Sequence, residues 1–132
     1  MSFLRITSPH GHSPISTTQV MQAVLLATLP GIAVLTWFFG PGTLLNIVFG
    51  GLLALAFEAM ALRLRDRNPK PYLQDYSVLV TSTLLCIALP PYAPWWLIAT
   101  GILSAVILGK HVFGGLGYNP FNPAMVGYVV LL

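Results

Sequence analysis

The fold is decided by residues 20–62, which read VMQAVLLATLPGIAVLTWFFGPGTLLNIVFGGLLALAFEAMAL. The 52 residues that precede Glu58 contain no Asp, Glu, Lys or Arg. A helix needs only about 20 apolar residues to cross the hydrocarbon core of a membrane. Phe39-Gly40-Pro41-Gly42 predicts a turn inside this stretch, because proline stops a helix and glycine allows positive φ. We therefore expect two membrane-spanning helices, over residues 20–39 and 43–62.

The composition of the whole chain supports a membrane protein. Of its 132 residues, 56% are apolar and 7% are charged, and the mean hydropathy is +0.81. A soluble domain carries roughly 25% charged residues. The composition therefore excludes a water-soluble enzyme or a nucleic-acid-binding protein, and it indicates the lipid bilayer as a partner. Cys86 is the single cysteine, so cysteines alone can form neither an intrachain disulfide nor a metal site.

Three further apolar stretches follow residue 76. Residues 77–89 are too few to span a bilayer comfortably and end at Pro90-Pro91, whereas residues 95–113 are long enough. Residues 124–132 begin a fifth helix and stop after nine residues, so we expect the chain to be the N-terminal part of a longer protein. The predicted fold is an all-α, polytopic transmembrane helix bundle, with about four spans, the start of a fifth, and a short or broken third helix.

The basic residues orient these spans. Four of the six Lys and Arg residues lie between Arg63 and Lys70, and positively charged short loops stay in the cytoplasm. We therefore expect a cytoplasmic N-terminal segment over residues 1–19, followed by a transmembrane domain over residues 20–132. Residues 110–122 return to the cytoplasmic side in this topology.

Small residues recur at four-residue spacing in three of the expected spans, a pattern that lets helix backbones approach closely. These residues are Ala23, Ala27 and Gly31; Gly50 and Ala54; and Gly101, Ala105 and Gly109. We expect these stripes to mark contacts between helices.

Two further sets of residues are weaker candidates for a functional role. Glu58 is an acidic group in a membrane span, but near the interface it can reach water or the arginines at positions 63 and 65. His10 and His12 lack further ligands of the usual kind nearby, so we expect no metal site.

Residues 109–124 form the stretch richest in candidate binding residues. Asn122 followed by Pro123 predicts a helix N-terminus, whose N–H groups attract anionic or carbonyl oxygens. Gly114 and Gly115 allow close backbone approach to a flat ligand, and Asn119 and Asn122 can bond to the edge of a heterocycle. Lys110 lies near enough in sequence to offset negative charge on a reduced ligand. The residues alone leave open a purely structural cap and turn.

Several motifs along the chain resemble one family of membrane redox subunits. They are Ser8-Pro9-His10, Thr17 or Thr18, Met21, Leu29-Pro30-Gly31, Asp75-Tyr76-Ser77 with Thr81, Leu89-Pro90-Pro91, Gly109-Lys110, residues 113–117 (FGGLG) and residues 119–124 (NPFNPA). The chain is similar to the D subunit of the Rnf ion-translocating electron-transport complex. It also resembles the related B subunit of the sodium-pumping NADH:quinone oxidoreductase.

The resemblance implies a non-autonomous membrane subunit of a translocase, located in a bacterial inner membrane. It would pass electrons by way of flavin between reduced ferredoxin and NAD, coupled to Na⁺ or H⁺ movement, with other membrane subunits as partners. The family carries FMN on a threonine of a Ser-Gly-Ala-Thr motif and a non-covalent riboflavin. This motif does not occur here, so the resemblance implies an attachment threonine beyond Leu132.

Two other functions compete with this one. Asn122-Pro123-Ala124 matches the aquaporin signature, which suggests an aquaporin-like or urea-channel-like solute channel. A second such tripeptide, which aquaporins need, is absent from the sequence. The other alternative is a scaffold membrane subunit without a cofactor.

Overall fold

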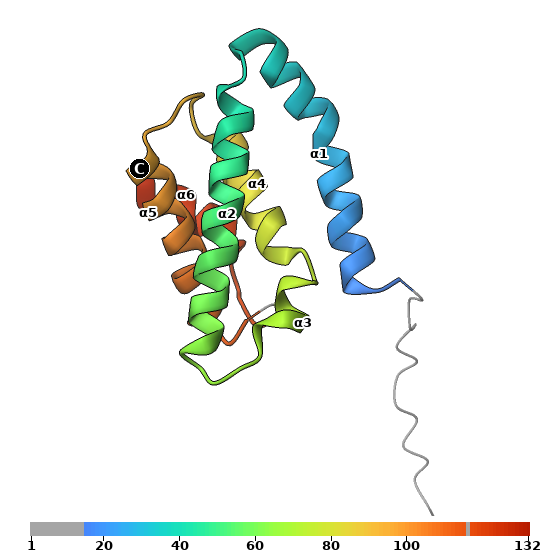
Figure 1. Cartoon of the computed structure of the whole chain (residues 1–132), viewed down its shortest axis with the longest axis vertical. Helices are drawn as coiled ribbons and strands as arrows, with labels where there is room; N and C mark the ends of the chain where they lie inside the picture. The colour runs from blue at the N-terminus through green and yellow to red at the C-terminus, as the bar shows by residue number, and fades with distance from the viewer. Residues whose placement is uncertain (1–14, 116) are drawn as a thin grey trace, which may run out of the picture.

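The computed structural model describes residues 15–115 and 117–132, and every regular element in this part of the chain is helical (Figure 1). The predicted all-α bundle is confirmed. The elements are α1 (Thr17–Phe39), α2 (Gly42–Arg63), α3 (Pro69–Leu73), α4 (Ser77–Ala88), α5 (Trp95–Val106), the π-helix η1 (Ile107–His111) and α6 (Pro123–Leu131).

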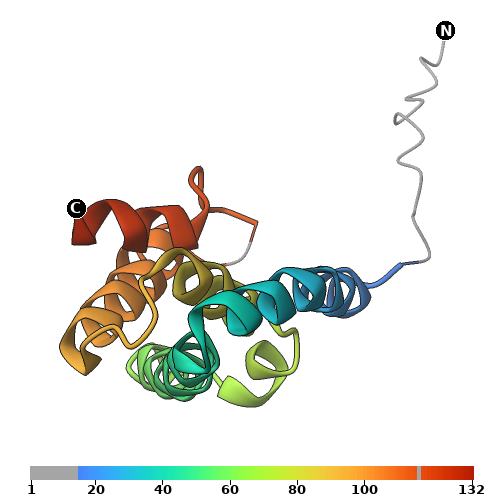
Figure 2. The ribbon, with the colours of Figure 1, turned by 90° about the horizontal axis from the view of Figure 1, so that it is seen from above.

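The first two helices form the long hairpin that the sequence predicts. By length and composition, α1 with 23 residues and α2 with 22 residues are both able to cross a membrane. Ser16 caps α1 by accepting from the backbone N–H of Gln19, while the Gln19 side chain accepts from the backbone N–H of Ser16. Only Ile32 of α1 is buried, and α1 stands at the side of the bundle away from α5 and α6 (Figure 2). An apolar helix exposed on nearly all sides suits a lipid environment better than water.

Helix α4 is short, as predicted, and the chain after it is held by protein. It has 12 residues and ends before Pro90-Pro91. The Asn46 side-chain amide of α2 donates to the Pro90 carbonyl at 2.9 Å, and Cys86 Sγ donates to the Asn46 carbonyl at 3.2 Å. Unsatisfied backbone carbonyls are costly at membrane depth. The predicted satisfaction of this turn by protein groups is therefore confirmed for Pro90.

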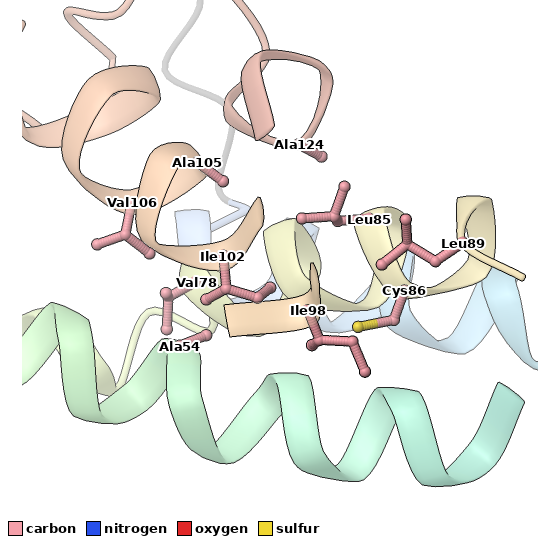
Figure 3. Packing of buried hydrophobic residues seen from close by; sticks show 10 residues of the cluster. All are labelled: Ala54, Val78, Leu85, Cys86, Leu89, Ile98, Ile102, Ala105, Val106 and Ala124. Atoms are coloured by element: carbon pink, nitrogen blue, oxygen red, sulfur yellow. The ribbon is translucent and has the colours of Figure 1, made fainter. Parts of the chain in front are cut away.

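The core lies where α2, α4, α5 and α6 meet (Figure 3). Leu85 from α4 and Ile102 from α5 are almost fully buried there, and Ala124 at the start of α6 closes one side. The small side chain of Ala54 allows α2 to approach this group closely.

The expected small-residue stripes are confirmed in two helices out of three. Gly50 and Ala54 are buried in α2, and Gly101, Ala105 and Gly109 are buried in α5 and η1. A Cβ atom on Gly101 would lie 2.6 Å from Leu131 Cδ1 of α6. The stripe on α1 is exposed instead, and a Cβ atom on Gly31 would meet no atom within 4 Å.

Two elements differ from expectation. The basic connection contains α3, which the Asn68 side chain caps by accepting from the Lys70 backbone N–H. The fourth apolar stretch does not continue as an α-helix to residue 113, because it changes to the π-helix η1 at Ile107. In η1 the Val112 N–H donates to the Ile107 carbonyl, five residues earlier, at 2.9 Å.

The connections gather at two ends of the bundle, as the predicted topology requires. At one end, a Cβ atom on Gly42 would lie 2.7 Å from the Tyr92 backbone nitrogen, so the α1–α2 and α4–α5 connections touch. At the other end, Arg67 of the basic connection and Gly114 line a common cavity. The basic connection and the glycine-rich segment therefore share one side.

Candidate buried charge cluster and adjoining cleft

Glu58 of α2 is fully buried, with a relative exposure of 0%. Its carboxylate accepts from Lys110 Nζ at 2.7 Å through Oε1 and lies 2.9 Å from His111 Nε2 through Oε2. The expectation that it reaches water, Arg63 or Arg65 is wrong. The physical reason is that η1 brings two basic side chains from 52 and 53 residues away into the same interior position.

Lys110 also donates to the hydroxyl of Ser77 at 2.9 Å, so the cluster joins α2, α4 and η1. Glu58, Ser77, Lys110 and His111 are called the charge cluster below. A buried ion pair is tolerated when its remaining hydrogen-bonding groups are also satisfied. Among the described residues, no buried side-chain nitrogen or oxygen lacks a hydrogen-bond partner.

The start of α4 places Ser77 in this cluster. Tyr76 adopts a left-handed conformation with φ 62°, and the Asp75 carboxylate accepts from the Ser77 N–H at 2.8 Å. This geometry turns the chain sharply from the basic connection into α4. The Asp75 carboxylate therefore satisfies the first N–H group of α4.

Two adjacent residues of the π-helix η1 reach one carboxylate. In η1, both Lys110 and His111 are buried and both lie within bonding distance of Glu58. π-Helical turns often occur at functional sites.

The glycine-rich segment begins directly after η1 and is called the glycine loop here (residues 112–119, of which 116 is not described). Gly114 and Gly115 have φ angles of 104° and 113°, a region that glycine adopts readily. Their N–H groups donate to the carbonyls of His111 and Lys110, each at 3.1 Å. The two glycines therefore offer a ligand close approach rather than free N–H donors.

Gly114 and Gly115 line a cleft of about 350 Å³ beside the basic connection. Arg67, Tyr72, Asp75 and Tyr118 also line it. A volume of this size falls within the range of roughly 300–1,000 Å³ typical of small-molecule sites. The cleft offers one cation, one carboxylate, two aromatic rings and bare backbone.

The five predicted site residues occupy different places in the structure. Gly114 and Gly115 line the cleft, whereas Lys110 and Asn122 line a separate cavity of about 180 Å³ beside Ser77. Asn119 Nδ2 donates to the Phe121 carbonyl at 2.8 Å within the loop.

Asn122 and Lys110 each have a structural role. The Asn122 side chain accepts from the Ala124 N–H at 3.0 Å and caps α6, as predicted. The Lys110 ammonium is buried against Glu58, so its charge is already balanced and is not free to offset a reduced ligand. Arg67 is the exposed cation at the cleft.

His10 and His12 lie outside the described residues. Within residues 15–115 and 117–132, no group of three or more His, Cys, Asp or Glu side chains could hold a metal ion. The expected absence of a metal site there stays a prediction.

Two features of the sequence indicate the charge cluster, although the motifs considered above do not include them. Glu58 is the only acidic residue within the predicted spans, and Lys110-His111 is the only basic pair between residues 71 and 132. Charges inside a membrane domain usually pair with one another. This rule predicts a Glu58–Lys110 pair, although it cannot supply the π-helical turn that adds His111.

A helical bundle with an apolar exterior and a buried carboxylate paired to a lysine from a distant segment belongs to the class of polytopic membrane proteins. Comparison with known protein families identifies the family within this class. The NQR2, RnfD, RnfE family matches residues 5–132, and the chain belongs to this family.

Curated relatives carry one shared description. The chain is 58% identical over all 132 residues to the D subunit of an ion-translocating oxidoreductase complex from Ectopseudomonas mendocina. The proteins with the same description from Pseudomonas aeruginosa PAO1 and Cellvibrio japonicus are 54% and 48% identical over the whole chain. The chain spans 37–38% of the length of these relatives.

Proposed function

We propose that this chain forms part of the membrane subunit of a redox-driven, ion-translocating complex, and that the cleft beside the glycine loop binds a flavin. One observation carries the proposal. Gly114 and Gly115 line a ligand-sized cleft and continue directly from η1, which holds the buried charge cluster. A redox ligand in the cleft would therefore lie next to charges inside the membrane helices, the arrangement that coupling electron transfer to ion movement needs.

The residues around the cleft fit an isoalloxazine ring. Tyr72 and Tyr118 provide aromatic surfaces, and aromatic groups stack favourably on flat ring systems. A Cβ atom on Gly115 would meet nothing within 4 Å, so a planar ligand can approach this backbone closely. Arg67 supplies a positive charge, which favours the negative charge of a reduced ligand. The flavin would supply one- and two-electron transfer when bound.

The remaining features of the proposal rest on the family. The cleft is assigned to the non-covalent riboflavin, and covalent FMN to a threonine beyond Leu132. The proposed electron partners are reduced ferredoxin and NAD, coupled to translocation of Na⁺ or H⁺. Other membrane subunits of the same complex are the proposed protein partners, in a bacterial inner membrane with the N-terminus in the cytoplasm.

Family membership favours this function over a passive solute channel. In the structure, Asn122 of the Asn-Pro-Ala tripeptide uses its side-chain oxygen to cap α6. A scaffold subunit without a cofactor is the alternative that the following experiment excludes or supports.

The test measures flavin in the natural protein purified with its complex. Acid precipitation separates non-covalent from covalent flavin, and both are quantified by absorbance and fluorescence. Arg67→Gln removes the cation at the cleft, and Arg63→Gln is the matched control because Arg63 ends α2 and does not line the cleft.

We expect Arg67→Gln to weaken non-covalent flavin binding about tenfold, since a charge-assisted hydrogen bond contributes about 1.5–3 kcal/mol. The Arg63→Gln variant should retain wild-type flavin content. A wild-type complex without non-covalent flavin would support the scaffold. Equal flavin affinity in both variants would place the flavin elsewhere in the complex.

A further inference from the structure

The charge cluster and the wall of the cleft are joined by backbone hydrogen bonds. The Lys110 carbonyl accepts from the Gly115 N–H, and the His111 carbonyl accepts from the Gly114 N–H, each at 3.1 Å. The same two residues bond through their side chains to Glu58. Lys110 and His111 therefore link a carboxylate on α2 with the two glycines that line the cleft.

Glu58 is the side chain that fixes this link. Within the described part of the chain, it is the only acidic group paired with Lys110 or His111. Each of its two oxygens bonds to one of the two residues, and all three side chains are buried. A displaced carboxylate would leave a buried ammonium without its counter-charge, which strongly destabilises the present position of η1.

The cluster and the glycines are also close in space. A narrow opening of about 10 Å³ is lined by Glu58, Lys110 and His111 together with Gly114 and Gly115. This volume is about one probe sphere, the smallest space that holds a water molecule. The cleft wall and the cluster are thus separated by no more than this opening.

We infer that Glu58 is a positioning residue for the ligand site, since it sets the backbone of Gly114 and Gly115 by fixing Lys110 and His111 in η1. That the cleft binds a ligand, and that this ligand is a flavin, rests on the proposed function; the link from Glu58 to the two glycines does not. A link of this kind is reciprocal, so a ligand that fixes the glycines also stabilises the cluster, and the intact cluster strengthens ligand binding by the same factor.

The alternative is that the cluster merely stabilises the helix bundle. Asn46→Ala provides the matched control for that case. Asn46 is buried in the same helix, twelve residues before Glu58 and about 18 Å away along the axis. Its hydrogen bond to the Pro90 carbonyl holds the opposite end of the bundle. Both variants remove a buried polar contact of α2, but only one contact leads to the glycine loop.

The experiment follows backbone hydrogen exchange in the natural protein with its complex, resolved by peptide mass spectrometry. Glu58→Gln keeps the side-chain size and removes the charge. We expect amide exchange at Gly114 and Gly115 to accelerate at least tenfold, while exchange near Pro90 stays unchanged. Asn46→Ala should show the opposite pattern. Two milder variants, Glu58→Asp and Ser77→Ala, test the same link if Glu58→Gln does not fold.

Glu58→Asp retains the charge, so it should accelerate loop exchange less than Glu58→Gln does. Ser77→Ala removes one partner of Lys110 and should also accelerate it, by a smaller factor. Unchanged exchange at both glycines in the folded variants would overturn the inference. A uniform increase in hydrogen exchange across all helices would also overturn it, because a general loss of stability produces that pattern. Hydrogen exchange in the glycine loop can be measured with or without bound flavin. A wild-type complex without flavin would therefore contradict the proposed function. It would not affect the test of the link between Glu58 and the two glycines.

Discussion

At the scale of single residues, Lys110 illustrates what a buried charge in a membrane helix requires. Its ammonium is 2.7 Å from Glu58 and 2.9 Å from the Ser77 hydroxyl, and the residue is 3% exposed. Replacing a complete ion pair with apolar residues is often tolerated, whereas removing one partner leaves the other charge buried. The energetic consequence therefore depends on which partner is left behind.

We predict that Lys110→Met destabilises the protein by about 3–5 kcal/mol, because Glu58 keeps only His111 as a partner. Lys70→Met is the control, since Lys70 is exposed on α3 and such substitutions usually change stability by about 0.5 kcal/mol or less. Thermal unfolding in detergent measures both. Equal melting temperatures for the two variants would contradict the importance of the pair. The double variant Glu58→Gln/Lys110→Met should recover part of the loss.

A second residue-scale prediction concerns Asn122, which caps α6 and was also expected to contact a ligand. Ser caps helices about as well as Asn but has no amide group. Because Asn122 does not line the cleft, we expect Asn122→Ser to melt like wild type and to retain its non-covalent flavin. Asn122→Ala should lose about 1 kcal/mol of stability. Loss of flavin from Asn122→Ser at an unchanged melting temperature would contradict the placement of the flavin in the cleft.

At the scale of helices, the bundle depends on glycines where backbones approach closely. A Cβ atom on Gly127 of α6 would lie 2.6 Å from the Gly101 carbonyl oxygen and 3.0 Å from Ala105 Cβ. Both atoms belong to α5, and a backbone carbonyl cannot move aside as a side chain can. Helix α6 therefore has to separate from α5 before any larger residue fits.

We predict that Gly127→Ala destabilises the protein by about 1–3 kcal/mol, the range observed for overpacked interiors. Gly31→Ala is the matched control on α1, where the added methyl group meets no atom within 4 Å. That substitution should be neutral or stabilise by up to about 1 kcal/mol, because alanine favours helix. The melting temperatures of the two variants test this prediction. A Gly127→Ala variant as stable as wild type would mean that α5 and α6 do not pack this closely.

The helices that the sequence predicts correctly are those with strong local signals. The 52 uncharged residues and the turn at Gly40 define α1 and α2, and Pro90 ends α4. Asn122 with Pro123 fixes the start of α6. All these signals act within a few residues, so no tertiary information is needed to interpret them.

The elements that sequence reasoning missed depend on distant contacts. The π-helix η1 has no local signature, and its buried basic residues bond to Glu58, more than 50 residues away. Glu58 itself was misinterpreted because its position in the sequence favours the nearby Arg63 over the distant Lys110. The cleft was anticipated only through Gly114 and Gly115, since Arg67 and Tyr72 join it through the tertiary fold.

At the scale of the whole molecule, the connections lie at two ends of the bundle, and their charge decides which end faces the cytoplasm. Arg67, Tyr72, Gly114 and Tyr118 meet at one end, and Gly42 meets Tyr92 at the other. Positively charged short loops remain in the cytoplasm during membrane insertion. The end that carries the cleft should therefore be cytoplasmic.

The predicted orientation is tested with fusions to a reporter that is active only in the periplasm. A fusion after Lys70 should be inactive, because it follows the basic connection, and a fusion after Tyr92 should be active. A fusion after Tyr118 must behave like the one after Lys70, since both sites lie at the same end of the bundle. High activity after Lys70 with none after Tyr92 would invert the topology. Different behaviour at Lys70 and Tyr118 would contradict the bundle itself, because these connections could not then share the walls of one cleft.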